Sequence, residues 1–255
     1  MTKAIVLAGS LNNGRLKECS SAPNEALIKI DNKYMIEYVI EALQGAEKID
    51  GILISGPKKH LQEIFKEGPG LQLVENGQTI IQSLENAVNI LNDKENRILV
   101  VTSDIPLITG GIIDSFLEKC QGLEEDIVYP IVAKILNQAK FPEVKRTYAK
   151  LQEGTYTGGN IFLINPEIVK PCANKAEEVV KLRKSPLKLV KYIGFTYFLK
   201  YITGNLSIKD VEERVSQLFN IKGKAIPVSF PEISVDVDKP SDLELVENYF
   251  KKSSV

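Results

Sequence analysis

Carboxylates at two distant points of this 255-residue chain have the setting to hold a divalent cation. Residues 100–106 read Val-Val-Thr-Ser-Asp-Ile-Pro, so Asp104 follows an apolar run that is typical of a buried strand. Residues 235–240 read Val-Asp-Val-Asp-Lys-Pro and supply Asp236 and Asp238. Open α/β sheets bind ligands at the carboxyl ends of their strands, where Asp104 is expected. The three acids therefore predict a divalent-metal site.

Each acid also has a purely structural interpretation. Asp104 stands two residues before Pro106 and is compatible with a turn or the start of a helix. Asp238 is compatible with the cap of the last helix, because a Lys-Pro pair follows it. Asp236 alternates with two valines, so on a strand it shares a face with Asp238, and both can point into one cleft. We keep both as candidate ligands.

A loop rich in small residues follows the first apolar run of the chain. Residues 7–15 read Leu-Ala-Gly-Ser-Leu-Asn-Asn-Gly-Arg. Small residues let backbone N–H groups approach phosphate oxygens closely, and the guanidinium of Arg15 can pair with a phosphate in a forked geometry. A strand followed by glycine is common, so a flexible surface loop is the alternative interpretation. Together with the separated acids, the loop predicts nucleotide chemistry.

These groups require elements that bring them to one place. In the first half of the chain, segments with the pattern of strands alternate with segments of helical spacing. The strands are expected at 4–7, 51–55, 71–74 and 98–102, and the helices at 34–43, 58–66, 80–91 and 112–120. This alternation predicts an α/β fold with three α/β/α layers and a mostly parallel, Rossmann-like sheet. Right-handed crossovers then place the carboxyl ends of these strands at one edge.

The second half of the chain departs from this alternation. Further strands, some of them antiparallel, are expected at 126–134, 147–151 and 160–164. A mainly helical stretch follows and predicts a helical insertion or lid over about 166–222. Strands at 225–230 and 233–237 and a closing helix over about 240–250 complete one domain, residues 1–255.

Composition narrows the classes of function. With 44% hydrophobic residues the chain can bury a large core, and its net charge of −1 gives no general attraction to nucleic acid or to an anionic membrane. No apolar run is long enough to span a bilayer, and three widely spaced cysteines fit neither a disulfide framework nor a zinc site. We expect a cytoplasmic protein without nucleic-acid or membrane partners. His60, the single histidine, follows two lysines on an expected surface helix far from every motif, so histidine catalysis is poorly supported.

The first loop and the segments after it carry a resemblance to a known family. Residues 7–15 are followed by Asn-Glu-Ala-Leu-Ile-Lys-Ile-Asp-Asn-Lys at 24–33 and Met-Ile-Glu-Tyr-Val-Ile at 35–40. This resembles the start of the MobA-like nucleotidyltransferases, and 103–106 and 236–240 resemble the metal-binding segments of that family. The resemblance extends from end to end and is weakest at about 134–225. It implies the fold of the nucleotide-diphospho-sugar transferases.

The resemblance also implies a role for each motif. Mg²⁺ is held by Asp104 and by Asp236 or Asp238, and it bridges the phosphates of the nucleotide. Arg15 acts with Asp104 in catalysis by neutralising phosphate charge. The expected nucleotide-binding residues are Leu7, Ala8, Gly9, Ser10, Gly14, Asn76, Gly77, Ser83 and Ser103. The expected acceptor-binding residues are Gly159, Asn160, Arg183 and Lys184. The glycines at 77 and 159 are equally compatible with ordinary turns.

The chain departs from the family pattern at several positions. Ser10 stands where a second glycine is usual, and Glu25 aligns with a lysine that neutralises phosphate. The change at Glu25 is the serious one, because a carboxylate near a triphosphate is repulsive unless it is turned away. Lys17, Lys29 or Lys33 could supply the missing charge.

The sequence and the resemblance together predict a Mg²⁺-dependent transfer of NMP from an NTP to a small phosphorylated acceptor, with release of pyrophosphate. One alternative is a glycosyltransferase on the related fold, which uses a nucleotide sugar. Such enzymes have a compact Asp-x-Asp after the fourth strand, where this chain has Thr-Ser-Asp at 102–104. The other alternative is a nucleotide-binding regulator without catalysis, which Glu25 favours. The base, the acceptor and the oligomeric state stay open.

Overall fold

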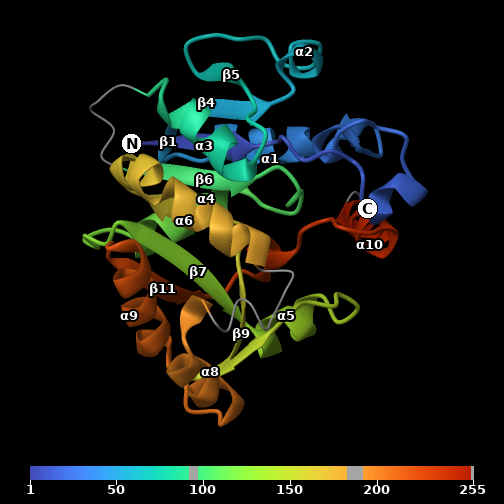
Figure 1. Ribbon diagram of the computed structural model, residues 1–255. Coiled ribbons are helices and arrows are strands. Elements are labelled where there is room, and N and C mark those ends of the chain that lie inside the picture. The colour runs from blue at the N-terminus through green and yellow to red at the C-terminus, as the bar shows by residue number, and fades with distance from the viewer. Residues whose placement is uncertain (92–96, 183–191, 254–255) are drawn as a thin grey trace.

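A mixed sheet of nine strands lies between layers of helices in the computed structural model, which describes residues 1–91, 97–182 and 192–253 (Figure 1). The strand order is β5-β4-β1-β6-β10-β7-β9-β8, and β11 pairs with the remaining edge of β7. The predicted three-layer α/β/α class with a mostly parallel sheet is confirmed.

Four neighbouring strands form the parallel half of the sheet. They are β1 (Thr2–Leu7), β4 (Ile49–Gly56), β5 (Leu71–Glu75) and β6 (Ile98–Thr102). The last residue of β1, Leu7, is in register with Ser55 of β4 and with Thr102 of β6. Because parallel strands end at one edge, the loops after these four strands meet there.

The other half of the sheet is mostly antiparallel. Strand β10 (Ile161–Ile164) runs antiparallel to both β6 and β7 (Ile127–Ala133). Strands β9 (Gly154–Gly158) and β8 (Ala149–Leu151) continue this pattern beyond β7. Strand β11 (Gly223–Val228) is parallel to β7 and returns the chain to the sheet after the helical part.

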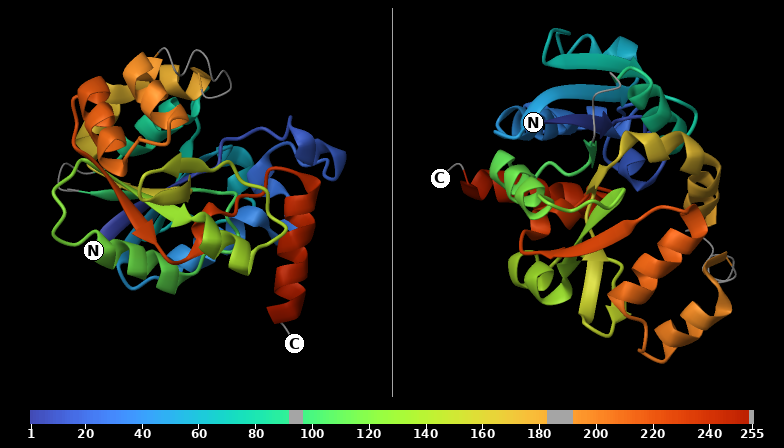
Figure 2. Two further views of the ribbon diagram at one scale, coloured as in Figure 1. Left: turned by 90° about the horizontal axis from the view of Figure 1, so that it is seen from below. Right: turned by 90° about the vertical axis from the view of Figure 1, so that its left-hand side faces the viewer.

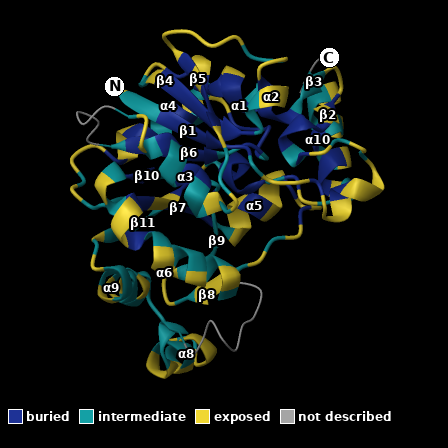
Figure 3. Cartoon of the chain, turned by 45° about the horizontal axis from the view of Figure 1, so that its top comes forward, coloured by how far each residue is buried: buried dark blue, intermediate teal, exposed yellow. Residues whose placement is uncertain are grey.

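Helices cover both faces of the sheet (Figure 2), and the central strands are largely buried (Figure 3). Ala4 and Val6 of β1 pack in the cluster that includes α1 and α4, whereas Ile5 packs in the cluster that includes α3 and α6. The bounds of these helices are α1 (Met35–Gln44), α3 (Ile80–Val88), α4 (Gly110–Lys119) and α6 (Val169–Leu182). A period of two on the central strand therefore fixes which helices cover which face.

A third buried cluster joins the two ends of the chain. Val235 and Val237 are 0% exposed and pack with Leu16 from the N-terminal part and with Val246 of the closing helix. This cluster holds the segment that carries the C-terminal acids against the residues that follow the first loop.

Three α-helices of the described residues lie in sequence between β10 and β11, within the range where the helical insertion was expected. They are α6, α8 (Phe195–Ile202) and α9 (Ile208–Phe219). The remaining elements are η1 (Arg15–Glu18), η2 (Glu25–Leu27), β2 (Lys29–Ile30), β3 (Lys33–Tyr34), α2 (Lys58–Leu61), α5 (Lys134–Lys140), η3 (Pro166–Ile168), η4 (Pro231–Ser234) and α10 (Pro240–Ser253). None of the helices in the described part of the chain has the length and apolar character needed to cross a bilayer.

Three segments differ from their predicted structure. The segment 233–237 is not a strand: η4 is followed by an extended chain whose valines are buried by side-chain packing, not by strand pairing. The helix expected at 58–66 is only the short α2, because the N–H groups of Glu63 and Ile64 donate to carbonyls three residues back, at 3.2 and 3.1 Å, which is the pattern of a turn. The strand expected at 126–134 leads directly into α5, a helix too short for its spacing to predict it.

Candidate nucleotide and metal site

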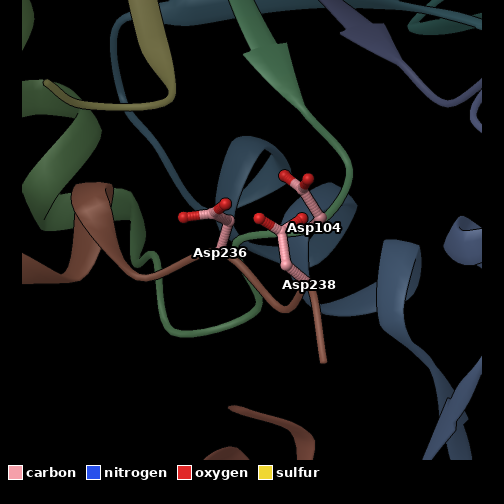
Figure 4. Close-up of side chains that lie close together, drawn as sticks. All are labelled: Asp104, Asp236 and Asp238. Carbon is pink, nitrogen blue, oxygen red and sulfur yellow. The ribbon is translucent and has the colours of Figure 1, made fainter. Parts of the chain in front are cut away.

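Three acids meet at the carboxyl edge of the sheet (Figure 4). Asp104 follows the end of β6, and Asp236 and Asp238 belong to the segment between η4 and α10. One carboxylate oxygen of each acid lies within 4.8 Å of one from each of the other two. The backbone N–H of Val237 donates to the carbonyl of Asp104 at 2.9 Å, so the two segments are fixed to each other. The structure therefore brings together the three residues for which a metal was predicted.

The two C-terminal acids face the site although they are not on a strand. Val235 and Val237 are both 0% exposed and point into the third cluster. In an extended chain neighbouring side chains point to opposite sides, so Asp236 and Asp238 point away from that cluster and toward Asp104. The predicted alternation of side chains at 235–238 is present, but it results from the packing of the two valines under α10 and not from a strand.

Burial and mutual repulsion raise the pKa of Asp104 and of Asp236. The pKa of Asp104 is raised to about 6, first by burial and then by the charge of Asp236, while a hydrogen bond of 2.5 Å from the hydroxyl of Thr102 opposes the rise. The pKa of Asp236 is also raised to about 6 by burial, which Arg146 opposes and Asp238 reinforces. A cation among these carboxylates would relieve the repulsion.

A guanidinium already faces the acids, and the sequence did not single it out. Nη1 of Arg146 pairs with Oδ1 of Asp236, and Nη2 donates to the backbone carbonyl of Asp236 at 2.8 Å. The Arg146 side chain is 10% exposed, and its buried Nε makes no hydrogen bond within the described residues. Arg146 lies at 141–148, between α5 and β8, where the sequence has no periodicity and no motif. No sequence signal could have identified it.

Glu25 lies close enough to the acids for the charges of Asp104 and Asp238 to act on its carboxyl group. It begins η2, and its N–H donates to the carbonyl of Ser10 at 3.0 Å, so it is tied to the first loop. Its pKa is raised to about 7, first by burial and then by the charges of Asp104 and Asp238. The carboxyl group therefore keeps its proton to a higher pH than an ordinary glutamate, which reduces its repulsion of a triphosphate.

Two of the three lysines considered as replacements for the missing charge are engaged elsewhere. Nζ of Lys29 lies 5.3 Å from the ring centre of Tyr34, and Nζ of Lys33 pairs with the carboxylate of Glu41 at 2.6 Å. Lys17 is exposed on η1, directly after the first loop. Of the three, Lys17 is the one whose position suits a phosphate.

Two cavities that share lining residues lie beside the first loop. The predicted residues that line the smaller one, of about 250 Å³, are Leu7, Gly9, Ser10, Gly77 and Ser83. The larger one, of about 730 Å³, shares Gly9 and Gly77 and reaches Asn76. Pockets for small ligands typically have about 300–1,000 Å³. The structure therefore gathers most of the predicted nucleotide-binding residues around a space of suitable size.

Hydrogen bonds within the loop after β5 fix its shape. The N–H of Gly77 donates to the hydroxyl of Ser83 at 3.1 Å, and this hydroxyl donates to the carbonyl of Thr79 at 2.9 Å. A Cβ atom on Gly77 would lie 2.3 Å from Cβ of Gln82, so the loop accepts only glycine there without moving. The Ser83 hydroxyl is thus used within the loop, and so is Nδ2 of Asn76, which donates to the carbonyl of Gly77 at 2.9 Å, so backbone groups are better placed to meet a base.

The other residues predicted for the nucleotide lie beneath the first loop or on it. Ala8 and Ser103 are buried, and the N–H of Ser103 donates to the carbonyl of Leu7 at 3.2 Å. Gly14 is exposed, and Arg15 is exposed at the start of η1. Ala8 and Ser103 therefore support the loop from below, whereas the Arg15 side chain has room to meet a phosphate.

Asn160 is the predicted acceptor residue that lies at the acids. Its Nδ2 donates to the carbonyl of Ile233 at 3.2 Å and lies 3.5 Å from Oδ1 of Asp236. It therefore joins β10 to the segment of the C-terminal acids. Arg183 and Lys184 lie outside the described residues.

Gly159 allows η4 to pack closely on β7. A Cβ atom there would lie 2.9 Å from Cδ1 of Ile233 and 3.0 Å from Cγ of Pro130. Its N–H donates to the carbonyl of Pro130 at 2.9 Å. The contacts that the structure shows for Gly159 are thus with the protein core, and its contact with an acceptor stays a prediction.

His60 is close to the other motifs, and the expectation that it lies far from them was wrong. It lines the cavity of about 730 Å³ together with Asn76, Gln78 and Gln82. Helix α2 follows β4, and β4 pairs with both β1 and β5, so the loops after these three strands converge. His60 is therefore a candidate contact for a bound nucleotide.

A comparison of the sequence with models of known protein families identifies the family of this chain. The model of the MobA-like NTP transferase domain matches residues 4–168. The chain belongs to this family. The matched part of the MobA-like chain includes the parallel half of the sheet, the first loop and Asp104, whereas Asp236 and Asp238 lie beyond it. No curated protein matches the chain.

Solved structures extend the similarity of this MobA-like protein over the whole chain. A hypothetical transferase from Thermus thermophilus is 36% identical, with a TM-score of 0.81 over 95% of this chain and 99% of its own. A 4-diphosphocytidyl-2C-methyl-D-erythritol synthase from Anaerococcus prevotii is 11% identical, with a TM-score of 0.60 over 98% of both chains. A CMP:2-keto-3-deoxy-manno-octonic acid synthetase in complex with CTP is 14% identical, with a TM-score of 0.59 over 99% and 100%. The last two show a common fold, the nucleotidyltransferase type that was predicted.

Proposed function

We propose that this MobA-like protein is a Mg²⁺-dependent nucleotidyltransferase that moves NMP from an NTP to a small phosphorylated acceptor and releases pyrophosphate. The observation that carries the proposal is the convergence of three carboxylates within 4.8 Å at the sheet edge. The N–H of Ser103, next to Asp104, donates to the carbonyl of Leu7 at the start of the small-residue loop, so this loop and Asp104 lie at adjacent strand ends, which supports a common site.

The chemistry of the acids fits Mg²⁺. Carboxylate oxygens are the hard anionic ligands that Mg²⁺ takes, and it completes its coordination with phosphate oxygens and water. Asp104 with Asp236 or Asp238 would hold the ion. When bound, Mg²⁺ neutralises the charge that develops on the phosphates during attack at the α-phosphorus.

The residues of the chain would act by positioning and by electrostatics. Backbone N–H groups at Gly9 and Ser10 would bind phosphate oxygens, and Arg15 would neutralise their charge. Backbone groups of Asn76 and Gly77 would contact the base, and Asn160 would face the acceptor. A direct in-line displacement needs the nucleophile and the leaving group to be aligned, and it needs no acid or base of its own from the protein.

CTP is the first nucleotide to test. Two neighbours with the same fold are a synthase named for a diphosphocytidyl product and a synthetase in complex with CTP. His60, Gln78 and Gln82 line the larger cavity and offer donors and acceptors for the edge of a base.

The first experiment is the thermal stability of the purified protein against the four NTPs, with and without Mg²⁺. We expect a rise in melting temperature that needs both Mg²⁺ and one NTP, and pyrophosphate release when a panel of sugar phosphates and alcohol phosphates is added. Asp104→Asn should abolish both effects. Asp50→Asn makes the same chemical change at an exposed position at the start of β4 and should leave both unchanged.

Other outcomes would replace the proposal. A rise with UDP- or GDP-sugars and none with NTPs would indicate the glycosyltransferase. Binding of an NTP without pyrophosphate release from any acceptor in the panel would favour the regulator, in which Glu25 marks a site without catalysis.

A further inference from the structure

Arg146 pairs with Asp236, one of the acids that are candidates to hold the proposed metal. Its Nη1 pairs with Oδ1 of Asp236, the same oxygen that lies 3.5 Å from Nδ2 of Asn160. Its Nη2 is fixed to the backbone carbonyl of Asp236 at 2.8 Å. The guanidinium is therefore docked on the acid-bearing segment by two contacts.

The ion pair makes Arg146 a counter-cation within the acid cluster, because a carboxylate oxygen of Asp236 lies within 4.8 Å of one from Asp104 and one from Asp238. Two cations that share one carboxylate repel each other at short range, and each would bind this carboxylate better without the other. The guanidinium and a divalent ion are thus competitors for Asp236.

The contacts of Arg146 are also incomplete. Its Nε is buried and makes no hydrogen bond within the described residues. A buried donor without an acceptor is unfavourable, so the position of the guanidinium on Asp236 is not its best possible environment. An anion with several oxygens, such as a phosphate, would satisfy the planar fork more fully.

We propose, building on the proposed Mg²⁺ site, that Arg146 competes with the divalent cation for Asp236 and so keeps the affinity for the free cation low. The cation is then taken up together with the nucleotide, whose phosphate oxygens supply further ligands and attract the released guanidinium. Through its ion pair with Asp236, Arg146 in this way controls the uptake of the metal ion.

Binding of Mn²⁺ to the full-length protein without nucleotide tests this competition, measured by titration calorimetry or by the loss of the free-ion signal in electron paramagnetic resonance. Arg146→Met should tighten Mn²⁺ binding by about tenfold, equivalent to about 1.4 kcal/mol. Arg146→Lys keeps a positive charge but loses the fork, and its affinity should lie between the two. Lys140→Met is the matched control, because Lys140 anchors the same segment through Glu232 without touching the three acids. It should leave the affinity within about twofold, a change of about 0.4 kcal/mol.

The results separate this inference from the proposed function. Asp104→Asn should remove Mn²⁺ binding from both the wild type and Arg146→Met, which locates the ion at the acids. If the two Arg146 variants bind Mn²⁺ no more tightly than the wild type does, Arg146 does not compete with the cation. Its role would then be to position Asp236. Failure of both the wild type and the two Arg146 variants to bind Mn²⁺ would overturn the metal site itself.

Discussion

Replacing Glu25 with Gln tests whether its carboxyl group faces the acid cluster. Its pKa is about 7 in the folded protein against an ordinary value of 4.5, so between these values the folded protein binds more protons than the unfolded chain. The favourable contribution of the Glu25 carboxyl group to the free energy of unfolding is fully present below about pH 4.5, and it is lost as the pH rises to about 7. Each unit by which a pKa rises corresponds to about 1.36 kcal/mol, so the whole rise in the pKa of Glu25 corresponds to ~3 kcal/mol of unfolding free energy. Because Glu25 is only half-buried, solvent screening reduces this to ~1–2 kcal/mol.

Glu25→Gln removes the carboxylate that is repelled at high pH. We expect the variant to be more stable than the wild type by ~1–2 kcal/mol at pH 8 and to differ little from it at pH 4.5. The assay is urea denaturation at both pH values in EDTA, which keeps metal from neutralising the acids. Glu63→Gln makes the same chemical change at an exposed position after α2 and serves as the control. A Glu25→Gln variant that is no more stable than the wild type at pH 8 would refute the placement of Glu25 against Asp104 and Asp238.

Three further changes give defined outcomes. Glu25→Lys should raise nucleotide transfer, measured as pyrophosphate release, if this position corresponds to the family's lysine; no gain would undo that alignment. Gly77→Ala should destabilise the protein by ~1–3 kcal/mol and weaken NTP binding, because its Cβ would meet Gln82 at 2.3 Å, whereas Gly70→Ala, with open space around it, should do neither. Phe116→Ala, in the core under α4, should cost ~3–5 kcal/mol in urea denaturation, and a loss below ~1 kcal/mol would contradict its full burial.

The parallel half of the sheet and its acid could be predicted because local patterns determine them. Apolar runs of strand length alternate with helical spacing up to residue 120, and each run ends where the chain turns at the sheet edge. Asp104 could be placed at this edge from its position after such a run. The two C-terminal acids could be paired with it because alternating valines fix their direction, even though no strand forms there.

The remaining parts of the site depend on contacts that the sequence does not encode locally. Arg146 lies in an irregular segment, and only the packing of α5 and η4 brings it to Asp236. His60 was misplaced because its own helix looks like a surface helix, and the convergence of three loops on one cavity is a property of the strand order. Glu25 could be recognised as a departure from the family, but the place of its backbone beside the first loop depends on the hydrogen bond to the carbonyl of Ser10.

The third buried cluster has a consequence for how the protein acquires activity during synthesis. Leu16 and Ile28 from the first part of the chain pack there with Val237 and with Val246 of α10. Contacts between such distant residues form late, and the N-terminal part leaves the ribosome first. A nascent chain can therefore complete the parallel half of its sheet while the acids are still apart. Under the proposed function, chemistry that needs acids from both segments can begin only when the last helix has docked, so a chain without that helix would not bind the cation.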